Sequence, residues 1–146
     1  MIGVSLPSDD ELFLAIRGQF DGTHRLCELA NELGRLHWRK LLGKPVCAES
    51  CCERAELIYE IDLWVSERLP VPHPSATLHT ETLGQVIDRF ACAVVGAYHL
   101  LMTLDPADVK VHAAWYRVAE LADGYTDLCT EVGNRARRLP VGGECR

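Results

Sequence analysis

The sequence lacks several features that define large classes of protein. It has 15 Lys and Arg residues against 21 Asp and Glu, a formal net charge of −6, so the positive surface that binds nucleic acid is not expected. No apolar run reaches the roughly 18 residues that are needed to cross a bilayer. The apolar N-terminal part has no cationic start of the kind that a signal peptide has. We therefore expect a cytoplasmic protein that binds neither nucleic acid nor membranes.

The motifs of common catalytic and cofactor sites are also absent. The chain contains no GxSxG, GxGxxG or HExxH and no phosphate-binding loop. It has no Glu-x-x-His, which a ferritin-like di-iron site requires on two of its helices. A mononuclear site built from His37, Asp62, Glu81 and His99 is conceivable, but the spacing of these residues selects no particular metal. We expect no metal and no cofactor.

Cysteine is present, but in a pattern that does not indicate disulfides. The seven residues are odd in number and irregular in spacing: Cys27, Cys47, Cys51, Cys52, Cys92, Cys129 and Cys145. Disulfides are also rare in the cytosol. We interpret most of these cysteines as small buried hydrophobic residues.

The chain does contain a series of amphipathic helical patterns. Ser8 followed by Glu11 is a capping-box pattern that predicts a short N-terminal helix. Four longer helices are predicted at about residues 23–42, 48–69, 80–104 and 109–139, divided by glycine and proline. We predict one all-α domain over residues 1–146, an antiparallel four-helix bundle with a short additional N-terminal helix laid across it. Its ordered core covers about residues 9–139, and the tail 140–146 is expected to be flexible.

A small basic group, Arg135, Arg137 and Arg138, lies at the end of the last predicted helix. Cations at this end of a helix complement its dipole. We therefore interpret the group as structural rather than as a binding site for nucleic acid.

Polar residues form a stripe along the otherwise apolar segment LHTETLGQVIDRFACAVVGAYHLL. The residues of this stripe recur at spacings that place them on one side of a helix: Glu81, Gln85, Asp88, Cys92 and His99. The simplest interpretation is the solvated flank of an amphipathic helix. The stripe contains no lysine, however, which favours an interior position.

Asp62 occupies an inner position of the third predicted helix, where an unpaired carboxylate would be costly. Its partner is expected to be Arg89, His37 or His99. The pair would be either a structural ion pair or part of a polar centre in the core. A histidine beside carboxylates is poised for acid–base chemistry near neutral pH. Glu81 and Asp88, if buried near each other, would raise one of their pKa values.

The segment HTETLGQVIDRFACAVVGAYHLL resembles the signature region of the domain of unknown function 4254 family, a group of bacterial helical proteins. The resemblance is strongest over residues 79–101, and the matching residues are Glu81, Thr82, Gly84, Ile87, Asp88, Arg89, Tyr98 and His99. The segments LHWR and YEIDLWV, with the pair Ile61-Asp62, are similar to other family helices. The chain differs from the family pattern at Gly96, where a lysine is expected, and at Arg39-Lys40, where an acidic pair is expected. The resemblance implies a helical fold and a choice of residues, and it implies no reaction.

These observations lead to two hypotheses about function. The first is a small-molecule-binding protein, or a cofactor-independent enzyme of secondary or small-molecule metabolism, with its pocket between the second, third, fourth and fifth helices. Its candidate catalytic residues are Asp88, His99 and Glu81, and its candidate substrate-binding residues are Arg89, His37, Asp62, Gln85 and Tyr98. The alternative is a non-enzymatic homodimeric or accessory interaction module in which the polar residues are structural.

Overall fold

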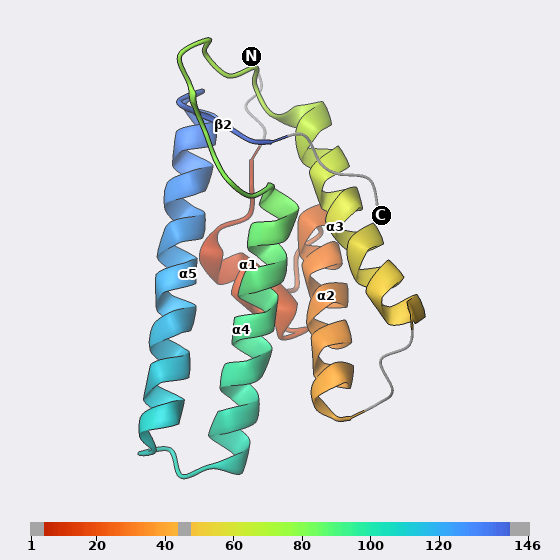
Figure 1. Cartoon of the computed structure of the whole chain (residues 1–146), viewed down its shortest axis with the longest axis vertical. Helices are drawn as coiled ribbons and strands as arrows, with labels where there is room; N and C mark the ends of the chain where they lie inside the picture. The colour runs from red at the N-terminus through yellow and green to blue at the C-terminus, as the bar shows by residue number, and fades with distance from the viewer. Residues whose placement is uncertain (1–4, 44–47, 141–146) are drawn as a thin grey trace.

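The computed structural model describes residues 5–43 and 48–140, and the side chains of residues 5–43 and 52–140. Within these ranges the chain is helical, with one short pair of strands (Figure 1). The elements are α1 (Asp9–Ile16), α2 (Arg25–Leu41), α3 (Ala48–Arg68), β1 (Thr77–Leu78), α4 (Leu83–Thr103), α5 (Val109–Gly133) and β2 (Arg137–Arg138). The all-helical prediction is confirmed.

The N-terminal helix α1 begins where its capping residues predict. The Ser8 hydroxyl accepts a hydrogen bond from the Glu11 backbone N–H, and the Glu11 carboxylate accepts one from the Ser8 N–H. The far end of α1 is tied to α2, because the Asn31 side chain donates to the Ala15 carbonyl at 2.8 Å. The short N-terminal helix of the prediction is therefore confirmed, and side-chain bonds fix both of its ends.

Helix α4 is the centre of the fold. It packs against α1, α2, α3 and α5, and Figure 1 shows it between α5 and α2. By length and composition alone α4 could cross a membrane, but the core helix of a globular protein passes the same test. Here much of its surface is buried against the other helices, including Ile87, Phe90 and Val94.

The arrangement of the four long helices agrees only in part with the predicted bundle. Consecutive helices from α2 to α5 alternate in direction (Figure 1). In the described part of the chain, however, the backbone of α5 lies close to those of α4 and α1 and not to those of α2 or α3. A four-helix bundle closed on all sides is therefore not confirmed.

Gly84 allows α3 to approach the first turn of α4 closely. A Cβ atom at this position would lie 2.6 Å from the Ile58 carbonyl oxygen and 2.7 Å from Asp62 Oδ1. Real Cβ atoms do not come so close to other atoms, so any side chain here would separate the two helices. Gly84, one of the residues that match the family pattern, is therefore needed for the close packing of α3 against α4.

The end of α5 differs from the prediction. The helix stops at Gly133, and Arg135 adopts a left-handed backbone conformation with φ of 64°. The Arg135 and Ala136 N–H groups donate to the Val132 and Glu131 carbonyls, which is the bonding pattern of a Schellman motif. Glycine is the usual residue at the left-handed position, so an arginine there hides this stop in the sequence.

The basic group Arg135, Arg137 and Arg138 consequently lies beyond the helix. Arg137 and Arg138 form β2, which pairs in parallel with Thr77 and Leu78 of β1. The interpretation of this group as the last turn of a helix is wrong, because the chain has already turned away from the helix axis. The predicted flexible tail lies outside the described residues, except for Pro140.

Candidate functional site

A buried ion pair joins the second and fourth helices. His37 of α2 donates from Nε2 to Asp88 Oδ1 of α4 at 2.8 Å. The two residues are only 7% and 4% exposed. Both belong to the apolar faces by which their helices pack. A charged pair in this position needs several partners, since burial removes its hydration.

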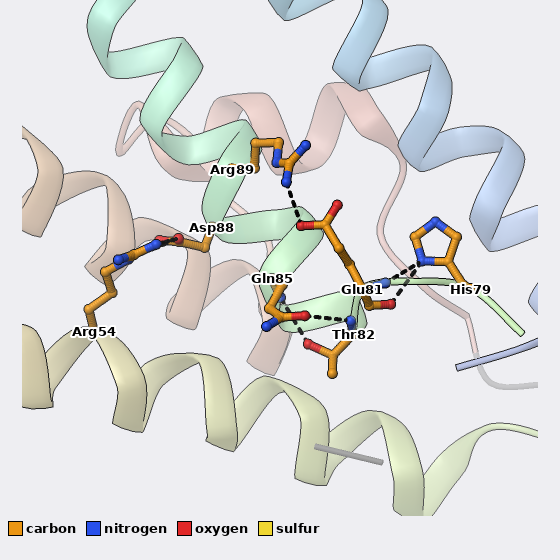
Figure 2. Close-up of polar contacts among 7 residues, drawn as sticks. All are labelled: Arg54, His79, Glu81, Thr82, Gln85, Asp88 and Arg89. Carbon is orange, nitrogen blue, oxygen red and sulfur yellow. Dashed lines mark hydrogen bonds and ion pairs between the residues drawn. The ribbon is translucent and has the colours of Figure 1, made fainter. Parts of the chain in front are cut away.

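Arg54 of α3 supplies the additional partner. Its Nε and Nη2 groups donate to Asp88 Oδ2 at 2.9 and 2.6 Å, and Figure 2 shows the guanidinium directed at this carboxylate. The Arg54 side chain is 51% exposed, so it stays partly hydrated while it binds the buried acid. Both carboxylate oxygens are thus engaged, and three helices meet at Asp88.

Cys92 connects the buried pair with the surface. It lies one helical turn after Asp88 on α4, it is exposed to solvent, and its thiol interacts with the His37 imidazole. Lys40, about one turn after His37 on α2, adds a positive charge near the sulfur. His37, Arg54, Asp88 and Cys92 together form what is called the charged cluster below.

The cluster shifts the proton affinity of its members. Burial alone would lower the His37 pKa, but the hydrogen bonds and charges of Asp88 and Cys92 raise it to about 9. Burial would raise the Asp88 pKa, yet the bonds and charges of His37 and Arg54 lower it. The hydrogen bond from His37 lowers the Cys92 pKa against the effect of burial. The shifts favour the charged forms of both groups, an imidazolium at His37 and a thiolate at Cys92.

These shifts predict a pH dependence of stability in a Cys92→Ser variant. The native His37 pKa, about 9 in the unaltered chain, lies above the unfolded value of about 6.5. The charged His37 therefore stabilises the native state fully below pH 6.5, and this contribution is lost as the pH rises toward the native pKa. We expect the free energy of unfolding of Cys92→Ser to fall by roughly 1–2 kcal/mol between pH 6.5 and 8.5, as measured by urea denaturation.

The unaltered protein is the control for this effect. In that protein the lowered Cys92 pKa acts on stability in the opposite direction to the raised His37 pKa, so the free energy of unfolding should fall less with pH than in Cys92→Ser. The free energy of unfolding of the double variant Cys92→Ser/His37→Gln should change little over this pH range. If the free energy of unfolding depended equally on pH in all three proteins, groups other than His37 and Cys92 would be its cause.

Glu81 and Arg89 form an ion pair of their own. Arg89 Nη2 lies 2.7 Å from Glu81 Oε2, and Figure 2 shows this pair apart from the contact between Arg54 and Asp88. The expectation that Arg89 anchors Asp62 is therefore wrong. A raised Asp88 pKa through repulsion from Glu81 is also wrong, because Asp88 is surrounded by cations and its pKa is lowered.

Asp62 and Gln85 support the start of α4. Asp62 Oδ1 accepts a hydrogen bond from the Gly84 N–H at 2.8 Å, so its predicted pairing with Arg89, His37 or His99 is wrong. Burial raises the Asp62 pKa, although bonds from Gly84 and Thr82 oppose the rise. Gln85 forms a reciprocal capping box with Thr82 (Figure 2). Free N–H groups at a helix start explain why both side chains are needed there.

Tyr98 and His99 lie further along α4 and take part in aromatic packing. The Arg17 guanidinium lies 3.3 Å from the centre of the Tyr98 ring, a cation–π contact. The His99 ring is edge-on to Trp38, with 6.3 Å between ring centres. Neither residue has a hydrogen bond or ion pair to the charged cluster among the described residues. Of the predicted set, only His37 and Asp88 belong to the charged cluster, and Glu81 and Arg89 form a separate pair.

Two of the hollows on the surface of the described residues are large, and no member of the charged cluster lines either of them. The larger, of about 960 Å³, follows α2 and includes Trp38 and Val95 in its lining. The smaller, of about 450 Å³, includes Asp62 and Arg138. Neither corresponds to the predicted pocket between four helices, because α2, α3, α4 and α5 do not all contribute to the lining of either one. The cluster is reached from solvent at Cys92.

A metal site is not apparent in the part of the chain that the structure describes. No group of three or more His, Cys, Asp and Glu side chains there is placed to hold a metal ion. In the charged cluster His37 and Asp88 already bond to each other, and Arg54 binds the remaining carboxylate oxygen. The arrangement suits proton transfer or nucleophilic chemistry better than ligation.

Sequence reasoning missed Arg54 and misjudged Cys92. Arg54 begins the stripe that continues with Ile58, Ile61 and Val65, the inner face of α3, so an arginine on an apolar stripe was the available signal. Cys92 stood on the polar stripe of α4, but was not named as a candidate site residue. Its exposure and its interaction with His37 place it in the site.

Comparisons with known proteins place most of this site within one family. The family model described as "Protein of unknown function (DUF4254)" matches residues 49–141. The matched range contains Arg54, Asp88 and Cys92, whereas His37 lies before it. No curated protein and no solved structure matches the chain.

Proposed function

Because the chain belongs to this family of unknown function, which supplies no reaction, we propose a function from the geometry of the charged cluster. The protein is a small-molecule-binding protein that performs cofactor-independent acid–base chemistry. The observation that carries the proposal is the buried pair His37–Asp88, which interacts with the exposed Cys92. A substrate would bind on the surface over Cys92, between α2 and α4.

Each member of the cluster has a definite task in this proposal. Cys92 is the exposed group that accepts a proton, and His37 is the acid that stabilises its thiolate. Asp88 holds the imidazole in position through Nε2. Arg54 keeps Asp88 ionised and directed at His37. The acid and the base then lie side by side, and the charged form of each is favoured by the other.

A substitution of His37 tests this function. We expect compounds from a mixture of small carboxylates, esters and amides to bind the unaltered protein in ligand-observed NMR. For those that bind over Cys92, binding should weaken at least tenfold in His37→Gln. The matched control is His112→Gln, because His112 is exposed on α5 and should not change binding. Equal binding to His37→Gln, or no binding to the unaltered protein, would contradict the proposal.

An interaction module is the second candidate, and α5 provides the observation in its favour. This helix packs only against α4, α1 and β2 among the described elements, and its Val109 and Tyr116 side chains are 79% and 70% exposed. A second copy of the chain packed on α5 would complete a four-helix bundle made of α4 and α5 from each copy. Sedimentation velocity at several concentrations distinguishes this dimer from a monomeric binding protein.

A further inference from the structure

Among the cysteines whose side chains the structure describes, Cys92 differs chemically from Cys27 and Cys129. Burial raises the pKa of Cys27 and that of Cys129 to about 11, so these thiols are protonated and unreactive at neutral pH. Cys92 is exposed, and its pKa is lowered by the bond to His37. A difference in environment of this kind separates structural cysteines from reactive ones.

The surroundings of Cys92 exceed what a structural role requires. An exposed thiol needs no partner for stability, yet Cys92 follows Asp88 by one helical turn and its thiol interacts with His37, whose imidazole is fixed by that buried carboxylate at 2.8 Å. The carboxylate is held by two N–H groups of Arg54. A nucleophile, a neighbouring base and a third group that orients the base are the parts of a catalytic triad.

We propose that Cys92 is the nucleophile of an acyl-transfer centre, in which His37 is the acid–base residue and Asp88 orients it. This inference rests on the proposed function and names its substrate class, a small activated carbonyl compound such as an ester or thioester. Lys40 lies near the sulfur, where a cation would stabilise the negative charge that develops on the carbonyl oxygen. Arg54 is a positioning residue, because it acts through Asp88.

The proposed reaction consumes only the carbonyl compound and water. The Cys92 thiolate attacks the carbonyl carbon, an S–C bond forms, and the π electron pair moves to oxygen. When this tetrahedral intermediate collapses, the bond to the leaving group breaks and the leaving group takes the proton of the His37 imidazolium. Water then attacks the thioester while neutral His37 accepts its proton, and the thiolate leaves. His37 is again protonated and Cys92 again a thiolate.

Acetylation by p-nitrophenyl acetate tests the inference on the full chain. We expect a burst of p-nitrophenol equal to one mole per mole of protein, and peptide mass spectrometry should place the acetyl group on Cys92. The burst should vanish in Cys92→Ser and slow about 100-fold in His37→Gln. Cys52→Ser is the matched control, because Cys52 is also an exposed cysteine, on α3, and this variant should keep the burst.

A second probe separates loss of folding from loss of chemistry. Alkylation of Cys92 by iodoacetamide should be faster at pH 7 than that of an ordinary thiol, whereas in His37→Gln it should slow to the rate and pH dependence of a thiol with a pKa of about 8.5. A burst that survives Cys92→Ser, or acetylation of Cys52 as fast as that of Cys92, would overturn the acyl-transfer proposal. Ligand binding that depends on His37 would then still support the acid–base function, so the two proposals fail separately.

Discussion

Replacing Asp88 with Asn should lower the native His37 pKa from about 9 toward its ordinary value near 6.5. The substitution keeps the shape of the side chain but removes the charge that His37 and Arg54 share. Burial of the imidazole then acts with less opposition. The His37 pKa can be read from an NMR titration of the imidazole proton, assigned by comparison with His37→Gln.

The same substitution should destabilise the fold by about 2–3 kcal/mol. Breaking a fully buried ion pair costs roughly 3–5 kcal/mol, and the value is smaller here because Arg54 is 51% exposed and can remain hydrated. Urea denaturation at pH 7 measures the change.

The control is Glu53→Gln, which breaks the exposed ion pair between Arg39 and Glu53. We expect it to cost less than about 0.5 kcal/mol. If Asp88→Asn cost no more than Glu53→Gln and left the His37 pKa high, then Asp88 would not organise the cluster.

Replacing Gly84 with Ala should destabilise the protein by about 2–3 kcal/mol. The added methyl group would overlap the Ile58 carbonyl oxygen and the Asp62 carboxylate, at 2.6 and 2.7 Å. The backbone oxygen cannot rotate away, so α3 would have to move from α4. Since Arg54 reaches Asp88 from α3, the charged cluster should be disturbed as well. Urea denaturation measures the first effect and the alkylation rate of Cys92 the second.

Gly96→Ala is the matched control on the same helix. A Cβ atom at Gly96 would meet nothing within 4 Å, so only the helix propensity changes, and we expect a gain of up to about 1 kcal/mol. A loss of stability in Gly84→Ala together with a gain in Gly96→Ala would show that the close approach of α3 is the reason that position 84 requires glycine. A similar gain at both positions would contradict the tight contact between α3 and α4.

The charged cluster connects the stability of the fold with its proposed chemistry. Three helices supply its side chains, so each helix must be in register for Cys92 to be activated. The fold can lose Cys92 at little cost, because this residue is exposed, whereas Asp88 is needed for both purposes. A variant of Cys92 therefore tests the chemistry with the fold intact, whereas a variant of Asp88 changes the chemistry and the stability together.

The helices of this protein were determined by local features of its sequence. Apolar residues at helical spacing predict α2, α3, α4 and most of α5, and the Ser8–Glu11 pair marks the start of α1. Such signals act within one or two helical turns, so they can be read without knowledge of the fold. The end of α5 is the exception, because Arg135 occupies the left-handed position where glycine is usual.

The candidate site was determined in part by sequence and completed by tertiary structure. Periodicity placed Asp88 and Cys92 on one stripe of α4 and His37 on the inner side of α2. The pairing of His37 with Asp88, 51 residues apart, and the contact from Arg54 depend on how three helices are rotated about one another. Glu81 and Asp62 look equivalent to Asp88 in the sequence, but packing directs them to Arg89 and to the Gly84 N–H. Rotation and close approach of helices are long-range properties, and only the folded chain decides them.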